Sequence, residues 1–161
     1  MSLPSVELEG ATGGTYRLDQ QPTRWLVLYL YPRTGRPGED PPDGWDLIPG
    51  ARGCTPQSCA FRDHHAELTT LNATVYGVSA QPIHEQREFT ERMHIPFPLL
   101  NDSGLVLADE PLRLPTFEFG GWTLYRRLTL CVEEGTIRKV FYPVFPPDRN
   151  ASEVLAYLRS V

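Results

Sequence analysis

The sequence lacks several features that would place it in particular classes of protein. No apolar run approaches the roughly 20 residues that a membrane-spanning helix needs. Acidic residues outnumber basic ones by 20 to 15, which gives a formal net charge of −5. A nucleic-acid partner, which usually requires a basic face, is therefore not expected. The opening MSLPSVELEG has neither a basic start nor an apolar stretch, which argues against a secretory signal.

Cysteine is also scarce, and its count is odd. The chain has 3 cysteines among 161 residues, too few and unpaired for the disulfide framework of a small secreted protein. We expect a cytoplasmic protein with reduced cysteines that are catalytic, metal-binding or inert. The length predicts one domain over residues 1–161, with a single core and no internal repeat.

Apolar runs and helical stretches alternate in the first half of the chain. RWLVLYLY at residues 24–31 and ATVYGVSA at residues 73–80 are typical of strands buried on both faces. Helical stretches at residues 56–72 and 82–93 follow these strands. The order strand, helix, strand, helix predicts a parallel α/β core.

The end of the chain has a different pattern. Segments 123–132 and 136–142 flank EEG, which predicts an antiparallel hairpin with Gly135 at the turn. A last helix is expected from about Asn150. A parallel unit, a hairpin and a closing helix together predict an α/β, thioredoxin-like three-layer fold, with a central mixed β-sheet flanked by helices.

Residues 33–53 do not fit a compact connection between a strand and a helix. Glycine and proline recur throughout RTGRPGEDPPDGWDLIPGARG, which prevents long regular structure. Such connections usually have two to six residues, and much longer ones are usually functional or disordered. We interpret this segment as an inserted active-site loop, in which Trp45 either fixes the loop to the body or lines a substrate entrance.

The two cysteines that follow this segment stand five positions apart. Pro56 is tolerated only in the first turn of a helix, and Thr55 is a plausible N-cap. Cys54 then lies at the helix N-terminus, where the helix dipole favours the nucleophilic thiolate, and Arg52 could add positive charge. Five helical residues separate the Cα atoms of Cys54 and Cys59 by about 8 to 9 Å. Because a disulfide needs less than about 7 Å, the pair can close only if the first turn unwinds.

The segment YLYP followed by GCTPQSCAFRD resembles the active site of the peroxiredoxins, in particular their Q-type or bacterioferritin-comigratory branch. The resemblance continues through RRLTLCVEEGTIRKVFY to the last helix. It implies that Cys54 attacks a peroxide oxygen, that Cys59 resolves the sulfenic acid as a disulfide, and that a thioredoxin-like reductant restores both thiols. Arg127 matches the arginine that holds the thiolate, with Arg113 as a weaker candidate. Neither a metal nor an organic cofactor is implied, and the branch suggests a monomer, with a dimer as the alternative.

One position departs from the family pattern. The family places a threonine three residues before the reactive cysteine, whereas this chain has Ala51 there. Thr34, in YPRT at the end of the first apolar run, is the nearest hydroxyl residue that precedes Cys54. We hypothesise that Thr34 takes the threonine's role and that residues 35–50 loop out.

Other interpretations of the same residues stay open. Cys59 could serve packing alone, and Cys131, inside a predicted strand, is expected to be a core residue. A disulfide reductase would need a C-x-x-C pair that the chain lacks, and a metal site through Cys54, Cys59 and His64 or His65 does not match zinc spacings. A thioredoxin-fold binding or redox-sensing module with little peroxidase turnover is the main alternative.

Overall fold

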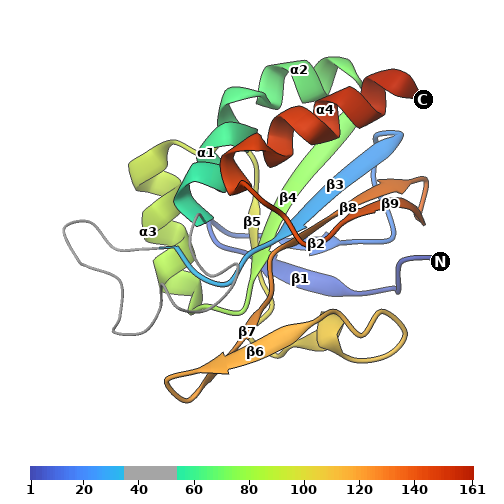
Figure 1. The fold of residues 1–161 in the computed structure, drawn as a ribbon. Coiled ribbons are helices and arrows are strands. Elements are labelled where there is room, and N and C mark those ends of the chain that lie inside the picture. Colours follow the sequence, from blue (N-terminus) through green and yellow to red (C-terminus); the bar gives the residue numbers. More distant parts are fainter. Residues whose placement is uncertain (35–53) are drawn as a thin grey trace.

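A computed structural model describes residues 1–34 and 54–161 (Figure 1). The strands and helices follow one another in this order: β1 (Glu7–Gly10), β2 (Thr15–Arg17), β3 (Trp25–Leu30), α1 (Cys54–Asp63), α2 (His65–Thr70), β4 (Ala73–Ser79), α3 (Ile83–Met93), β5 (Leu99–Asn101), the 3₁₀ helix η2 (Val106–Ala108), β6 (Thr116–Phe119), β7 (Trp122–Tyr125), β8 (Leu128–Glu133), β9 (Thr136–Phe141), the 3₁₀ helix η3 (Pro147–Arg149) and α4 (Asn150–Ser160). The predicted inserted loop, with Trp45, Ala51 and Arg52, lies outside the described residues from position 35 onward.

A seven-stranded mixed sheet forms the centre of the molecule, in the order β2-β1-β5-β4-β3-β8-β9. Strand β3 is parallel to β4 and antiparallel to β8, so Val27 faces Val75 on one side and Cys131 on the other. All six residues of β3 are buried, as predicted for a strand covered on both faces. Because β3 lies inside the sheet, between β4 and β8, the chain that leaves its carboxyl end starts from a strand covered on both sides.

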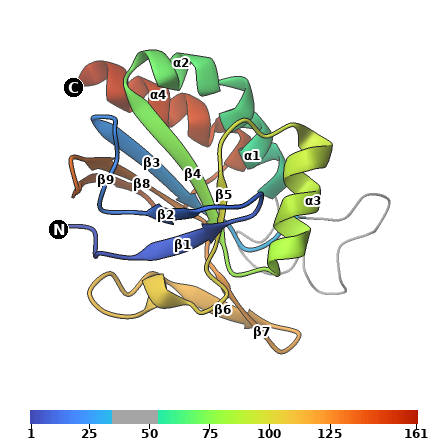
Figure 2. The ribbon, with the colours of Figure 1, turned by 180° about the vertical axis from the view of Figure 1, so that it is seen from behind.

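Each face of the sheet has its own apolar cluster. Residues of α1, α2, α3 and α4 pack on the face that carries Val27 and Tyr29. Leu26, Leu28 and Leu30 point to the opposite face, which is covered by the chain around η2. The two views show α2 and α4 together on one side of the sheet and the β6–β7 hairpin on the other (Figures 1 and 2). This layered arrangement confirms the predicted thioredoxin-like fold class.

The longer predicted elements are confirmed, with two corrections. Residues 24–31, 73–80 and 82–93 correspond to β3, β4 and α3, and the closing helix begins at Asn150. The helical stretch expected over residues 56–72 is present as two helices rather than one, because α1 ends at Asp63 and α2 begins at His65. Helix α1 already begins at Cys54, so Thr55 lies inside the helix rather than capping it.

The predicted hairpin is present at its turn but not along its whole first arm. Gly135 takes φ +84°, a backbone conformation that suits glycine, between β8 and β9. Segment 123–132 is not one strand: β7 pairs with β6 in a separate two-stranded sheet, and β8 starts only at Leu128. Arg126 and Arg127 lie in the break, where the backbone N–H of Arg126 donates to the Pro115 carbonyl at 3.0 Å. The break matters because it directs Arg127 inward.

Among residues 1–34 and 54–161, no helix is long and apolar enough to cross a membrane.

Candidate active site

Cys54 lies where the carboxyl end of β3 meets the amino end of α1. Its side chain is buried, with 3% of the residue exposed. Its sulfur accepts a hydrogen bond from the backbone N–H of Arg33 at 3.4 Å. The first turn of α1 adds the positive end of the helix dipole. The Cys54 sulfur therefore faces a backbone donor and the amino end of a helix.

Arg127 supplies the charged donor of the site. It is buried, and its Nη2 donates to the Cys54 sulfur at 3.1 Å. Its Nη1 donates to Oε1 of Gln57 at 2.6 Å. The planar guanidinium thus contacts the cysteine and the end of the first helical turn at once, a geometry that lysine cannot reproduce. The other candidate, Arg113, instead forms an ion pair with Glu110.

Gln57 and Asn150 extend this contact into a buried polar network. Nε2 of Gln57 donates to Oδ1 of Asn150 at 3.1 Å, and the Thr129 hydroxyl donates to the same oxygen at 2.6 Å. Gln57 follows Cys54 by three residues and so shares its helical face, a signal that sequence analysis could have used. No sequence pattern marks Asn150, which is 93 residues away from Gln57 along the chain.

Thr34 is buried beside the site, but its hydroxyl is directed to another residue. Both its backbone N–H, at 3.3 Å, and its hydroxyl, at 3.2 Å, donate to Oε1 of Gln81. A hydroxyl has one proton to donate, so in this arrangement Thr34 does not donate to Cys54. Gln81 in turn donates to Glu85 at 3.3 Å, and Glu85 forms an ion pair with Arg33 at 3.4 Å. Thr34 is thus joined to α3 through a side-chain network that the sequence did not suggest.

The second and third cysteines differ in their surroundings. Cys54, Cys59 and Cys131 are all free thiols. Cys59 is half-buried within the continuous helix α1, and burial raises the pKa of its thiol. Cys131 is fully buried in β8, as predicted for a core residue, and burial raises the pKa of its thiol to about 12. Both thiols are therefore protonated near neutral pH in this conformation.

An aromatic side chain of β3, Tyr29, packs against the buried face of α1. The Tyr29 hydroxyl donates to Oγ of Ser58 at 3.0 Å, and its ring stacks on Phe61 with centroids 4.6 Å apart. Burial raises the pKa of Tyr29 well above its usual value, so the hydroxyl stays a neutral donor. These contacts hold the helix body that carries both Cys54 and Cys59.

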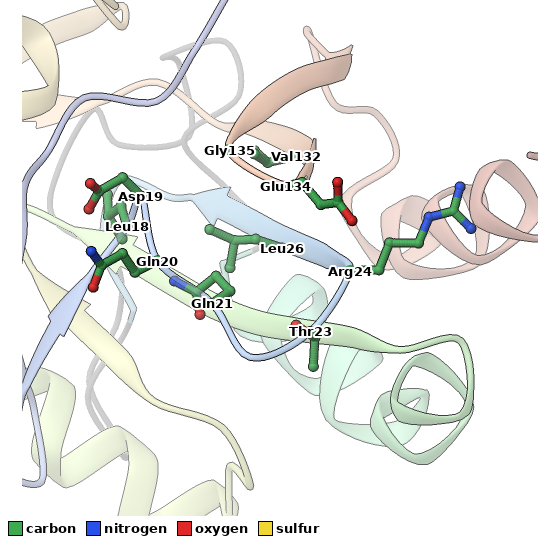
Figure 3. A pocket seen from close by; sticks show the side chains of 10 residues that line it. All are labelled: Leu18, Asp19, Gln20, Gln21, Thr23, Arg24, Leu26, Val132, Glu134 and Gly135. Atoms are coloured by element: carbon green, nitrogen blue, oxygen red, sulfur yellow. The ribbon is translucent and has the colours of Figure 1, made fainter.

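A separate cavity of about 320 Å³ lies at the other end of β3 (Figure 3). Its lining includes Gln20, Gln21, Arg24 and Val132. Arg24 precedes β3, whereas Cys54 contacts Arg33 beyond its far end, so a strand length of about 20 Å separates the cavity from the cysteine. The cavity is not part of the Cys54 site.

The described residues hold no group of three or more His, Cys, Asp or Glu side chains arranged to bind a metal ion. Of the histidines considered as ligands, His64 directs its Nδ1 to Glu67 at 3.0 Å.

Comparisons with known proteins show which family this chain resembles. Residues 47–140 match the model of the AhpC/TSA family. Peroxiredoxin Q, chloroplastic, of Populus jackii is 29% identical over 159 residues, which cover 98% of this chain and 66% of the relative. Peroxiredoxin Bcp of Bacillus subtilis (strain 168) is 34% identical over 106 residues, which cover 66% of this chain and 58% of the relative. The alignments thus leave about a third or more of each relative's length unmatched.

Solved structures show the same fold. Peroxidoxin BcpB from Mycobacterium tuberculosis superposes with a TM-score of 0.81 at 26% identity, covering 100% of this chain and 96% of that one. The bacterioferritin comigratory protein of Xanthomonas campestris gives a TM-score of 0.75 at 23% identity, covering 96% of this chain and 90% of that one. At this identity the second match supports the fold alone.

Proposed function

The chain belongs to the AhpC/TSA family, and on that basis we propose that it is a Q-type peroxiredoxin, a thiol-dependent peroxidase that reduces hydrogen peroxide or organic hydroperoxides. The observation that carries this proposal is the 3.1 Å contact between Nη2 of Arg127 and the Cys54 sulfur. A buried cation at this distance favours the thiolate, which is the nucleophilic form of cysteine. Cys54 is accordingly the residue that attacks the peroxide.

In the first step the Cys54 thiolate attacks one peroxide oxygen. A sulfur–oxygen bond forms, the oxygen–oxygen bond breaks, and its electron pair leaves with the second oxygen, which takes up a proton as water or an alcohol. Cys54 is oxidised to a sulfenic acid and the peroxide is reduced. Negative charge grows on the leaving oxygen, and the Arg127 guanidinium is the donor positioned to stabilise that charge.

In the second step Cys59 resolves the sulfenic acid. Its sulfur bonds to the Cys54 sulfur, the sulfenic hydroxyl leaves as water with the Cys59 proton, and a disulfide remains. Both cysteines lie on α1, so the first helical turn unwinds before the sulfurs meet. A dithiol reductant of the thioredoxin type then reduces the disulfide and is itself oxidised to a disulfide. Two electrons and two protons thus pass from the reductant to the peroxide.

Thr34 is the hydroxyl that we assign to the substrate side of Cys54. It follows Arg33, whose N–H contacts the sulfur, and its own hydroxyl bonds to Gln81. Rotation of the Thr34 hydroxyl from Gln81 toward the sulfur would complete the site. Peroxide kinetics of Thr34→Val check this assignment, since unchanged kinetics would remove Thr34 from the mechanism.

We further propose a cytoplasmic location and a monomeric state. The location follows from the odd number of cysteines, and all 3 are free thiols in this structure. The monomer follows from the resemblance to the Q-type branch, and light scattering of the reduced and oxidised protein distinguishes it from a dimer.

Peroxide titration of the fully reduced protein tests the whole scheme, read by intact mass and peptide mapping. Wild type is compared with Cys54→Ser and Cys59→Ser. We expect a Cys54–Cys59 disulfide in wild type, a sulfenic acid on Cys54 in Cys59→Ser, and no early oxidation in Cys54→Ser. Oxidation that stops at sulfenic acid in wild type would instead mean a one-cysteine enzyme with an external thiol. No reaction at Cys54 would favour a binding or redox-sensing module.

A further inference from the structure

Unwinding of the first turn of α1 must release whatever holds that turn to the body of the protein. Gln57, the last residue of the turn, is fully buried and bonded at both ends of its amide. One end accepts from Arg127, and the other donates to Asn150 at the start of α4. A bond between α1 and α4 therefore opposes the movement that joins Cys54 to Cys59.

The direction of each hydrogen bond in this network is fixed. Arginine only donates, so Gln57 must present its oxygen to Arg127 and its NH₂ group to Asn150. Asn150 must then present its oxygen, which also accepts from Thr129. Its own buried Nδ2 is left with no hydrogen-bond partner. Within this network Asn150 thus acts only as a hydrogen-bond acceptor, through its side-chain oxygen.

We propose that Asn150 is a positioning residue that controls the resolving step by holding Gln57 and so keeping the first turn of α1 wound. This proposal rests on the proposed function and deepens it, because it assigns the rate of disulfide formation to a residue that touches neither cysteine. A tightly held first turn prolongs the life of the Cys54 sulfenic acid. A second peroxide can then oxidise that acid further, to the sulfinic form.

The network offers a matched set of variants. Asn150→Ala removes the acceptor and leaves the buried Nε2 of Gln57 without its partner, which destabilises the wound turn. Asn150→Asp keeps the oxygen that accepts from Gln57 and Thr129, and replaces the NH₂ group that has no partner with a second carboxyl oxygen. Thr129→Val deletes the other hydrogen bond to the Asn150 oxygen and leaves the bond between Gln57 and Asn150 in place. Thr129 is as fully buried as Asn150, so the two substitutions disturb similar surroundings. Asn150→Ser, whose side chain is too short to reach Gln57, replaces Asn150→Ala if that variant does not fold.

The experiment measures disulfide formation after a peroxide pulse, by rapid acid quench and intact mass. The rate of sulfenic acid formation is measured separately in the Cys59→Ser background, so that any change in the first step is accounted for. We expect Asn150→Ala to form the disulfide about tenfold faster, a rate change that corresponds to about 1.4 kcal/mol in activation free energy. The same variant should resist oxidation of Cys54 to the sulfinic form. Asn150→Asp and Thr129→Val should stay within about threefold of wild type.

The same variants are compared by amide hydrogen exchange over residues 54–61 of the reduced protein, where Asn150→Ala should exchange faster. This measurement needs no reaction with peroxide. If Cys54 does not react with peroxide, the proposed function fails while the exchange still tests the bond to Asn150. An unchanged disulfide rate and exchange in Asn150→Ala would overturn the inference. Equal acceleration by Thr129→Val would also overturn it, since general destabilisation would then explain the effect.

Discussion

Replacement of Arg127 by methionine is the most direct test of the site. The guanidinium gives the Cys54 sulfur a charged donor at 3.1 Å and bonds Gln57 at 2.6 Å. Methionine fills a similar volume but supplies neither donor. Loss of one fixed donor to a developing negative charge typically costs about 10²- to 10³-fold in rate, or about 2.7 to 4 kcal/mol. We expect a loss of that size in the second-order rate constant for oxidation of Cys54.

The assay follows sulfenic acid formation in the Cys59→Ser background by rapid mixing and intact mass. In Arg127→Lys the rate of sulfenic acid formation should fall about tenfold. The lysine ammonium keeps the charge but cannot donate to Cys54 and Gln57 at once, as the planar guanidinium does. Arg126→Met is the matched control: its guanidinium lies over the Phe117 ring at 5.4 Å, and its removal should change the rate less than twofold. A rate within threefold of wild type in a folded Arg127→Met protein would refute the assignment of Arg127.

Three further outcomes follow from the packing and the titration of the described residues. Phe61→Ala removes a fully buried ring that stacks on Tyr29, and denaturant unfolding should show a loss of about 3 to 5 kcal/mol; a loss under 1 kcal/mol would contradict the packing. Gly77→Ala would place a Cβ 2.7 Å from Leu99 and from the Tyr29 ring, so we expect a destabilisation of about 1 to 3 kcal/mol by the same method, whereas an equally stable variant would argue against this strand register. Burial raises the pKa values of Cys59 and Cys131, so both are thiols at neutral pH, and alkylation of half-buried Cys59 should still accelerate with pH beyond the ordinary thiol pKa of about 8.5. Cys131 should be modified only after denaturation, and its rapid modification in the native protein would show that its burial is wrong.

The parts of the fold that sequence analysis predicted are those with strong local signals. Strand β3 has six consecutive apolar residues, and α4 repeats its buried positions at helical spacing. Strands β2 and β5, with three residues each, are too short to show a period and were not predicted. Their pairing depends on contacts with β1 and β4 that form only in the folded chain.

The residues of the candidate site likewise differ in whether a local sequence signal marks them. Cys54 was predicted from its position before a proline in the first turn of a helix, which is a local signal. Arg127 was predicted only by resemblance, because the break that turns it inward comes from the change of sheet between β7 and β8. Asn150 was not predicted at all, since its place beside Gln57 depends on how α4 packs against α1.

Thr34 shows why the position of a residue in the sequence does not fix its role. The sequence suggested a hydroxyl beside the cysteine, and Thr34 is indeed buried next to Arg33, which contacts the sulfur. Its hydroxyl proton nevertheless goes to the Gln81 side-chain oxygen, which also accepts the Thr34 backbone N–H. Gln81 therefore takes the one proton that the Thr34 hydroxyl can donate. The role that we propose for Thr34 therefore requires that its hydroxyl first leave Gln81, because the single hydroxyl proton cannot be donated to both groups at once.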